Sequence, residues 1–373
     1  MEQSFGDPAR GKWSEERAWA WYNKRPWIRG FNGYPSNCVS RIAMWQQYKH
    51  KEVFDEIRYE FGLAKETGFN AVRAIIQFEV WYYEHDSFMA NLEEYIALAD
   101  EFGLGVMLTL GNDGYPPKAK WKPVVFGEQP FDLGYHSGIK TGPYAGGYTE
   151  PGYSLIDEPE FEPHYYEMVE EIAARYAKDE RLLIWDVWNE PGMCRRDLLS
   201  LRPMENFFAI LRSHDPIQPL TASIWSFTED MHAKRALERR AAELSDVITF
   251  HSYRPYADTV LMVETLKADY GRPLLCTEWL HRILGNTVEE IFPLFYLERV
   301  GAFHWGLIAG LSQTYEPWGS YFEEYMKDGS TLDLTKWQHD LYRFNGLPYD
   351  PKEIRTIRRF CEAADRRDAA KNR

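Results

Sequence analysis

Short apolar runs alternate with amphipathic stretches along most of the chain. The apolar runs are rich in Val, Ile, Leu and Phe, a composition typical of buried β-strands. The clearest helix is predicted over residues 88–102, where Leu92, Ile96 and Ala99 share one face and Gly103 provides a left-handed stop. Strands are predicted in eight segments, centred on Ile28, Val72, Val106, Leu183, Leu220, Val247, Leu274 and Ala302.

This alternation predicts the fold class. Strands separated by helices need crossover connections, so we expect a parallel sheet whose strands are buried on both faces. Eight such units predict a closed (β/α)8 barrel, the TIM-barrel class of α/β proteins. The alternative is an open doubly wound sheet, which usually carries a Gly-rich phosphate turn after its first strand. Residues 30–34, Gly-Phe-Asn-Gly-Tyr, do not form that motif.

Two segments are longer than ordinary barrel connections. We expect one catalytic domain over residues 1–373, because α/β barrels reach this length as single units. Residues 111–157 are rich in Gly, Pro and Tyr without a helical period, and they predict an ordered lid over the active-site rim. A smaller insertion spans residues 312–332. Their aromatic residues include Trp121, Phe126, Phe131, Tyr135, Tyr144, Tyr148, Tyr153, Tyr315, Trp318 and Tyr321.

Charge and cysteine usage narrow the ligand classes. The formal net charge is −14, and without a basic stripe this disfavours nucleic acid and anionic membrane surfaces as partners. No secretory signal pattern and no apolar run of bilayer length is visible. Cys38, Cys194, Cys276 and Cys361 have no CxxC spacing. We therefore expect a cytoplasmic protein with neutral or cationic ligands, and the sequence indicates no oligomeric state.

Two glutamates carry the strongest candidate chemistry. Glu190 follows the apolar run 182–185 in Trp-Asn-Glu-Pro, and Glu278 follows the run 273–276 in Thr-Glu-Trp. If these runs are strands four and seven, both carboxyls reach the same rim. A separation of about 5 to 5.5 Å would make one a nucleophile and the other an acid and then a base, with retention of anomeric configuration. A structural alternative for the first motif is a helix start capped by Asn189.

This pattern resembles clan A of the glycoside hydrolases, and within it family 5 most closely. The family's strand-four motif Asn-Glu-Pro is matched by Asn189, Glu190 and Pro191. The resemblance implies that Glu190 is the acid/base and Glu278 the nucleophile. It also implies that Asn189 binds the sugar 2-hydroxyl. On strands two, six and eight it implies substrate-site roles for Arg73, His251, Tyr253 and Trp305.

Several of these residues also have structural interpretations. Arg73 lies in an apolar strand and needs a carboxylate partner, either the nucleophile or a purely structural one. Trp305 could form the floor of the cleaved sugar's subsite or pack in the barrel core. Many relatives place a histidine after strand three, where this chain has Asn112; we expect Asn112 and Asn32 to offer amides to the cleft. The remaining candidates are Glu79 and Glu316 as alternative rim carboxylates, and Trp81, Trp188, Trp225, Trp279 and Trp318 as sugar platforms, of which one or two should touch ligand.

The sequence therefore predicts a retaining glycoside hydrolase that cleaves β-linked glycosides or short oligosaccharides by double displacement. We expect exo action of the β-glucosidase, β-mannosidase or β-galactosidase kind, with no metal and no organic cofactor. One alternative is a metal-dependent sugar isomerase or aldolase on the same barrel, for which His251 and Glu278 have few obvious companions. Another is a non-catalytic sugar-binding barrel, which would normally have lost one glutamate.

Overall fold

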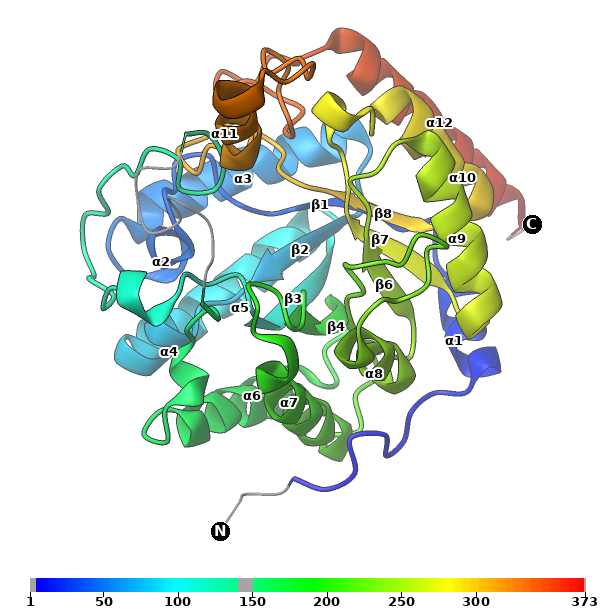
Figure 1. The fold of residues 1–373 in the computed structure, drawn as a ribbon. Coiled ribbons are helices and arrows are strands. Elements are labelled where there is room, and N and C mark those ends of the chain that lie inside the picture. The colour runs from blue at the N-terminus through cyan, green and yellow to red at the C-terminus, as the bar shows by residue number, and fades with distance from the viewer. Residues whose placement is uncertain (1–4, 140–149, 372–373) are drawn as a thin grey trace.

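The computed structural model describes residues 5–139 and 150–371, so the predicted lid aromatics Tyr144 and Tyr148 lie outside the described residues. Eight strands form one parallel sheet in the order β5-β4-β3-β2-β1-β8-β7-β6 (Figure 1). All eight predicted strand centres lie in a strand or next to one. The strands are β1 Arg29–Asn32, β2 Ala71–Ile75, β3 Gly105–Asn112, β4 Leu182–Asn189, β5 Leu220–Ala222, β6 Ile248–His251, β7 Leu274–Glu278 and β8 Gly301–His304.

The sheet closes on itself between β5 and β6. Ile224, just beyond β5, forms a parallel bridge with Phe250 of β6. Its amide donates to Thr249 O at 2.9 Å, and its carbonyl accepts from His251 N at 2.9 Å. The fold is therefore the predicted (β/α)8 TIM barrel, and the open doubly wound alternative is wrong.

Helices surround the strands, as Figure 1 shows. The helix α1 has a different position, because it precedes β1 and does not connect two strands of the barrel. Trp13, which lies just before it, and Trp21 within it pack against Met107 and Phe303 in the barrel interior, so this segment closes one end of the barrel. The helices are α1 Glu15–Asn23, α2 Arg41–Trp45, α3 His50–Thr67, α4 Phe78–Tyr83, α5 His85–Glu101, α6 Glu162–Tyr176, α7 Leu201–Ser213, α8 Ala236–Leu244, α9 Tyr256–Tyr270, α10 Val288–Glu298, α11 Gly319–Asp328 and α12 Pro351–Lys371.

The helix predicted over residues 88–102 is α5, which begins three residues earlier, at His85. Its first residues, His85, Asp86 and Ser87, are polar and gave no apolar period from which to place the start. At the other end Gly103 has φ 74°, the left-handed conformation expected of a helix stop.

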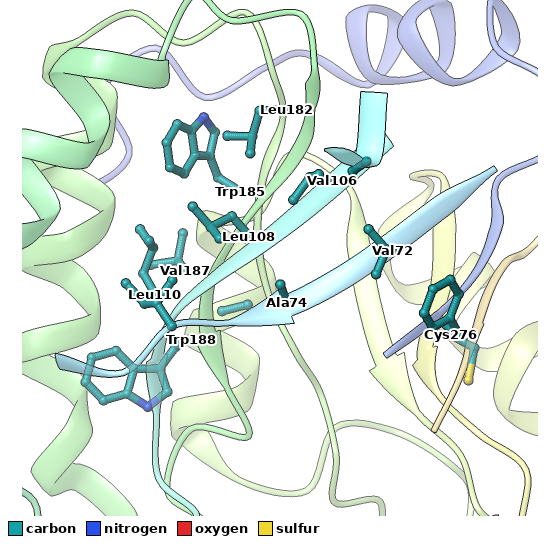
Figure 2. Close-up of a cluster of buried hydrophobic side chains, with 14 of the residues drawn as sticks. Val72, Ala74, Val106, Leu108, Leu110, Leu182, Trp185, Val187, Trp188 and Cys276 are labelled. Atoms are coloured by element: carbon teal, nitrogen blue, oxygen red, sulfur yellow. The ribbon is translucent and has the colours of Figure 1, made fainter. Parts of the chain in front are cut away.

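Side chains along the strands alternate between two environments. Val72, Val106 and Leu108 point outward into the layer between barrel and helices, which Figure 2 shows together with Trp185 and Trp188. The residues between them point into the barrel. Near α1 these inward residues are apolar, whereas nearer the strand ends they are polar and fully buried: Arg73, Thr109, Asp186, Thr221 and Thr249. A polar layer therefore underlies the rim.

The two insertions contact each other. In its described residues, the segment between β3 and α6 contains only the 3-10 turns η1 Lys118–Lys120 and η2 Leu155–Asp157. The insertion after β8 includes α11, a helix that the sequence pattern did not reveal. Gly134 N donates to Gln313 Oε1 at 2.9 Å, and Gly138 N donates to Pro317 O at 2.7 Å. Among the described residues, no helix is long and apolar enough to cross a membrane.

Candidate active site

A cavity of about 950 Å³ opens at the carboxyl ends of the strands. Its wall includes both glutamates singled out from the sequence. The lid contributes Tyr135 and His136 to the same wall, and α11 contributes Glu323. The nine residues for which the sequence predicted catalytic or substrate-binding roles all line this cavity: Asn32, Arg73, Asn112, Asn189, Glu190, His251, Tyr253, Glu278 and Trp305.

The two glutamates face each other across the barrel mouth. Glu278 is the last residue of β7, and Glu190 comes directly after β4. One carboxylate oxygen of each lies within 4.8 Å of the other and of a ring nitrogen of His251. This spacing is shorter than the roughly 6.5 to 9.5 Å at which one carboxylate activates a water against the sugar, and it lies near the roughly 5 to 5.5 Å at which one carboxylate can attack directly.

Glu278 is held by two donors. Arg73 Nη1 donates to its Oε1 at 2.9 Å, and the Tyr253 hydroxyl donates to its Oε2 at 2.8 Å. Burial raises the pKa of Glu278, while Arg73 and the Tyr253 hydrogen bond act against that rise. Both contacts favour the carboxylate form, which is the form a nucleophile needs.

Arg73 has two carboxylate partners. Besides Glu278, its guanidinium binds the fully buried Asp186 of β4, with Nη2 2.7 Å from Oδ2. Asp186 also accepts from the Thr109 hydroxyl at 2.7 Å. Arg73 therefore has both kinds of partner considered for it: Glu278, the candidate nucleophile, and Asp186, a structural carboxylate. Sequence reasoning missed Asp186, although a lone carboxylate inside an apolar strand was a signal for it.

Three asparagines complete the network around Arg73. Asn189 Oδ1 accepts from Arg73 Nη2 at 2.6 Å, and its amide nitrogen donates to Asn112 Oδ1 at 2.9 Å. Asn32 Oδ1 accepts from Arg73 Nη1 at 2.8 Å, and its amide nitrogen donates to the carbonyls of Thr277 and His304. The Asn32 amide is thus fully engaged within the protein, whereas Asn189 keeps one amide hydrogen for a ligand.

Glu190 has a different environment. Its Oε1 lies 2.7 Å from His251 Nδ1, and no Arg or Lys of the described residues forms an ion pair with it. Burial raises the pKa of Glu190 to about 7, with Arg73 opposing. Burial lowers the pKa of His251 to about 4, so its ring is neutral at neutral pH and one proton is shared across the contact. Glu190 can therefore hold a proton near neutral pH.

The backbone at Glu190 is left-handed. Its φ is 46°, a conformation that costs a non-glycine residue energy and that occurs often at functional sites. The amide of Glu190 donates to the Ser223 hydroxyl at 2.9 Å, which fixes the turn. Sequence reasoning did not identify Ser223, since it lies after β5 and meets this turn only through closure of the barrel.

Aromatic side chains form the outer part of the cavity. Trp305 lines it, and the ring of His136 from the lid stacks on Trp305 with centroids 5.2 Å apart. Trp225 and Trp318 line it as well. Three of the nominated tryptophans therefore reach the cavity. The remaining ones, Trp81, Trp188 and Trp279, are buried outside it.

A buried charge network anchors the lid to the loop that carries Glu190. Arg196 binds Asp113 at 2.8 Å through Nε, and it contacts both oxygens of Asp157 through Nη1 and Nη2 at 2.6 and 2.8 Å. Asp113 also accepts from Gly192 N at 2.6 Å. Asp113 directly follows β3 near the start of the lid, and Asp157 is the last residue of the lid. This network therefore holds both ends of the lid in place.

The two glutamates and His251 lie close enough together to be considered as a metal site. Glu190, His251 and Glu278 offer one ligand atom each within 4.8 Å, and two carboxylates with an imidazole suit several divalent ions. Arg73 stands 2.9 Å from Glu278, however, and its positive charge disfavours a second cation there. The donor set therefore fits a metal less well than its composition suggests.

Comparisons with known proteins agree with this geometry. The model of the cellulase family, glycosyl hydrolase family 5, matches residues 31–281. No significant match appears among curated protein sequences.

Among solved structures, a GH5_18 enzyme from Streptomyces cattleya in complex with GlcNAc is similar, with a TM-score of 0.58 at 16% identity over 92% of this chain and 80% of that one. An exo-β-1,4-mannosidase from Opitutaceae bacterium strain TAV5 gives 0.55 at 16% identity, over 91% of this chain and 60% of that one. The endo-β-1,4-mannanase of Thermotoga petrophila gives 0.53 at 15% identity, over 91% and 77%. At these identities the likeness shows the shared fold.

Proposed function

Because the chain belongs to glycosyl hydrolase family 5 and is a glycosidase, we propose that it cleaves β-linked glycosides by double displacement with retention of configuration. Glu278 attacks the anomeric carbon while Glu190 protonates the departing glycosidic oxygen. A glycosyl ester forms on Glu278, and the aglycone leaves with the proton from Glu190. Glu190 then removes a proton from water, which attacks the same carbon and releases the sugar.

The single observation that carries this assignment is the unequal bonding of the two glutamates. Glu278 receives hydrogen bonds from Arg73 and Tyr253, which favour its charged form. The carboxyl group of Glu190 contacts the neutral imidazole of His251 and neither Arg73 nor Tyr253. Burial raises the pKa of Glu190 to about 7. Two carboxyls whose surroundings separate their protonation states are the arrangement that acid and nucleophile require.

We further propose that the substrate is a short oligosaccharide or glycoside cut from one end. The lid and the insertion after β8 hold each other through Gln313 and Pro317 and bring Tyr135 and His136 into the cavity wall. A cavity wall built from the lid supports exo action over internal cleavage of a polymer. A β-mannoside is the first glycone to try, because structural neighbours are described as an exo-β-1,4-mannosidase and as a complex with Manβ1-4GlcNAc. β-Glucosides and β-galactosides come next.

The test is release of aryl alcohol from aryl β-mannoside, β-glucoside, β-galactoside, β-xyloside and β-fucoside. We expect turnover of one glycone, loss of turnover in Glu278→Ala, and release of the β-anomer first in a proton NMR time course. Glu316→Ala is the matched control, since Glu316 is a rim carboxylate outside the cavity lining. Turnover that survives Glu278→Ala, or first release of the α-anomer, would refute the assignment.

A product analysis decides between exo and endo action. With β-1,4-linked mannohexaose, exo action predicts a single monosaccharide or disaccharide product from the earliest time point. A ladder of intermediate lengths at early times would contradict the proposed exo action.

One alternative has an observation in its favour. The triad Glu190, His251 and Glu278 could hold a divalent ion, as a metal-dependent isomerase or aldolase would require. We expect incubation with EDTA followed by gel filtration to leave glycoside hydrolysis unchanged. Loss of activity that Mn²⁺, Co²⁺ or Zn²⁺ restores would favour the metal-dependent class.

We also propose that the enzyme works in a reducing compartment such as the cytoplasm. Within the part of the chain that the structure describes, Cys38, Cys276 and Cys361 are buried and form no disulfide bond. Secreted proteins more often pair their cysteines, because the compartments through which they pass are oxidising.

A further inference from the structure

A second cavity lies at the outer base of the lid, away from the catalytic glutamates. It measures about 740 Å³, a size typical of small-ligand sites. Within the described residues, its lining and that of the active-site cavity have no residue in common. The lining residues come from both ends of the lid, from the segment just before α6 and from α4, and they include Glu79, Trp121, Tyr153, Glu158, Glu160 and Phe161.

The lining combines flat aromatic rings with carboxyl groups. Five of the lining residues are aromatic and three are glutamates, and no Lys or Arg is among the described residues that line it. Aromatic faces suit the C–H faces of a pyranose ring, and carboxylates accept hydrogen bonds from hydroxyl groups. Anionic ligands are disfavoured, because three acidic side chains would repel them.

The charge balance favours a neutral ligand over a cation. Lys118 Nζ lies 2.5 Å from Glu158 and 4.6 Å from the ring centroid of Tyr153, so it already offsets one carboxylate. Glu79 is 5% exposed, accepts a hydrogen bond from Gln77, and has a pKa that burial raises. A carboxyl group whose charged form is disfavoured by burial attracts an ammonium group less than an exposed carboxylate does, so this wall suits hydroxyl groups better.

The cavity walls are held in place without a ligand. The two ends of the lid pair through the bridge between Pro117 and Gly152, and Tyr153 N donates to Pro116 O at 2.9 Å. The rings of Trp121 and Tyr153 meet edge to face with centroids 5.2 Å apart. A preformed wall lowers the entropy cost of binding.

The cavity is also connected to the active site through one polar contact chain. Glu79 accepts from Gln77, and Gln77 Oε1 accepts from Arg41 Nε at 2.9 Å. Arg41 lines the active-site cavity. We propose that the outer-lid cavity is a second saccharide-binding site, which takes a neutral mono- or disaccharide unit on Trp121 and Tyr153. The unit is either a free sugar or a remote part of a longer substrate.

Binding is measured first, by isothermal titration with mannobiose, cellobiose and N-acetylglucosamine. The protein carries Glu278→Gln, so that no probe is consumed and the result does not depend on hydrolysis or on the proposed function. We expect two binding sites per chain for at least one probe. Adding Trp121→Ala should weaken the second site about tenfold or more and leave the first unchanged. Glu160→Gln, at an exposed residue of the same lining, should weaken it without risk to folding.

Kinetics then separates the two sources of the sugar. For Trp121→Ala in the otherwise unchanged enzyme, a higher KM for mannohexaose with an unchanged KM for an aryl glycoside identifies a remote subsite. Loss of the second binding site with both KM values unchanged identifies a separate sugar. Trp19→Ala, at a residue that belongs to neither lining, is the control. The proposal is overturned if no probe gives a second site, if Trp121→Ala and Glu160→Gln leave it unaltered, or if choline occupies the cavity instead of the sugars.

Discussion

The hydroxyl of Tyr253 offers the sharpest test of the acid and nucleophile assignment. It donates to Glu278 Oε2 at 2.8 Å in a buried site, and Tyr253→Phe removes this one bond. The ring itself packs edge to face on Trp318 with centroids 5.3 Å apart, so phenylalanine keeps the shape. Of the two donors to Glu278, only Arg73 would then remain.

The size of the effect follows from the kind of bond that is lost. A hydrogen bond to a charged group contributes about 1.5 to 3 kcal/mol. At about 1.36 kcal/mol per factor of ten, this corresponds to roughly 10- to 160-fold in rate. The bond favours ionised Glu278, so its loss raises the pKa of Glu278. The ionised nucleophile is needed for attack, and the loss in kcat/KM should therefore be greatest at acid pH and shrink toward neutrality.

The assay is kcat/KM for the best aryl glycoside between pH 4 and 8. We expect the acid limb of Tyr253→Phe to move to higher pH, while the basic limb, set by Glu190, stays in place. Tyr321→Phe is the control, because the Tyr321 hydroxyl bonds to His281 and touches neither glutamate. A loss that is equal at every pH would refute the reasoning and show that the hydroxyl acts on the substrate and not on Glu278.

Three further predictions concern other buried charges. Glu190→Gln should remove the basic limb near pH 7 and slow aryl glycosides with poor leaving groups far more than dinitrophenyl glycosides, measured as kcat/KM against leaving-group pKa. Arg196→Met should destabilise the fold by about 3 to 5 kcal/mol in urea unfolding, because it strands Asp113 and Asp157; equal stability would contradict the network's role. Burial raises the pKa of Glu60 to about 8, so the native state holds this proton more tightly than the unfolded chain, and its contribution is lost as pH rises from 4.5 toward 8. Glu60→Gln does not titrate, so its Tm relative to wild type should rise over that range; a constant difference would exclude the titration.

The sequence determined the local elements and the class of fold. Apolar runs separated by helical periods are local patterns, and they placed β2 and β7 because a buried strand needs little more than a short apolar segment. The same patterns placed Glu190 and Glu278 at strand ends, and a parallel barrel gathers all such ends on one rim. The sequence did not reveal α11, which lies within an insertion without a strong period of its own.

The tertiary structure decided which groups meet and how they ionise. The carboxylate partners of Arg73 lie on β4 and β7, and Asp186 is 113 residues away along the chain, so only closure of the barrel identifies them. The raised pKa of Glu190 arises from burial, which sums over neighbours from several strands and cannot be read from local pattern. The contact of His136 with Trp305 likewise depends on how two insertions pack. Sequence fixes chemical groups and their local conformation, whereas distances between remote groups, and the dielectric around them, exist only in the folded chain.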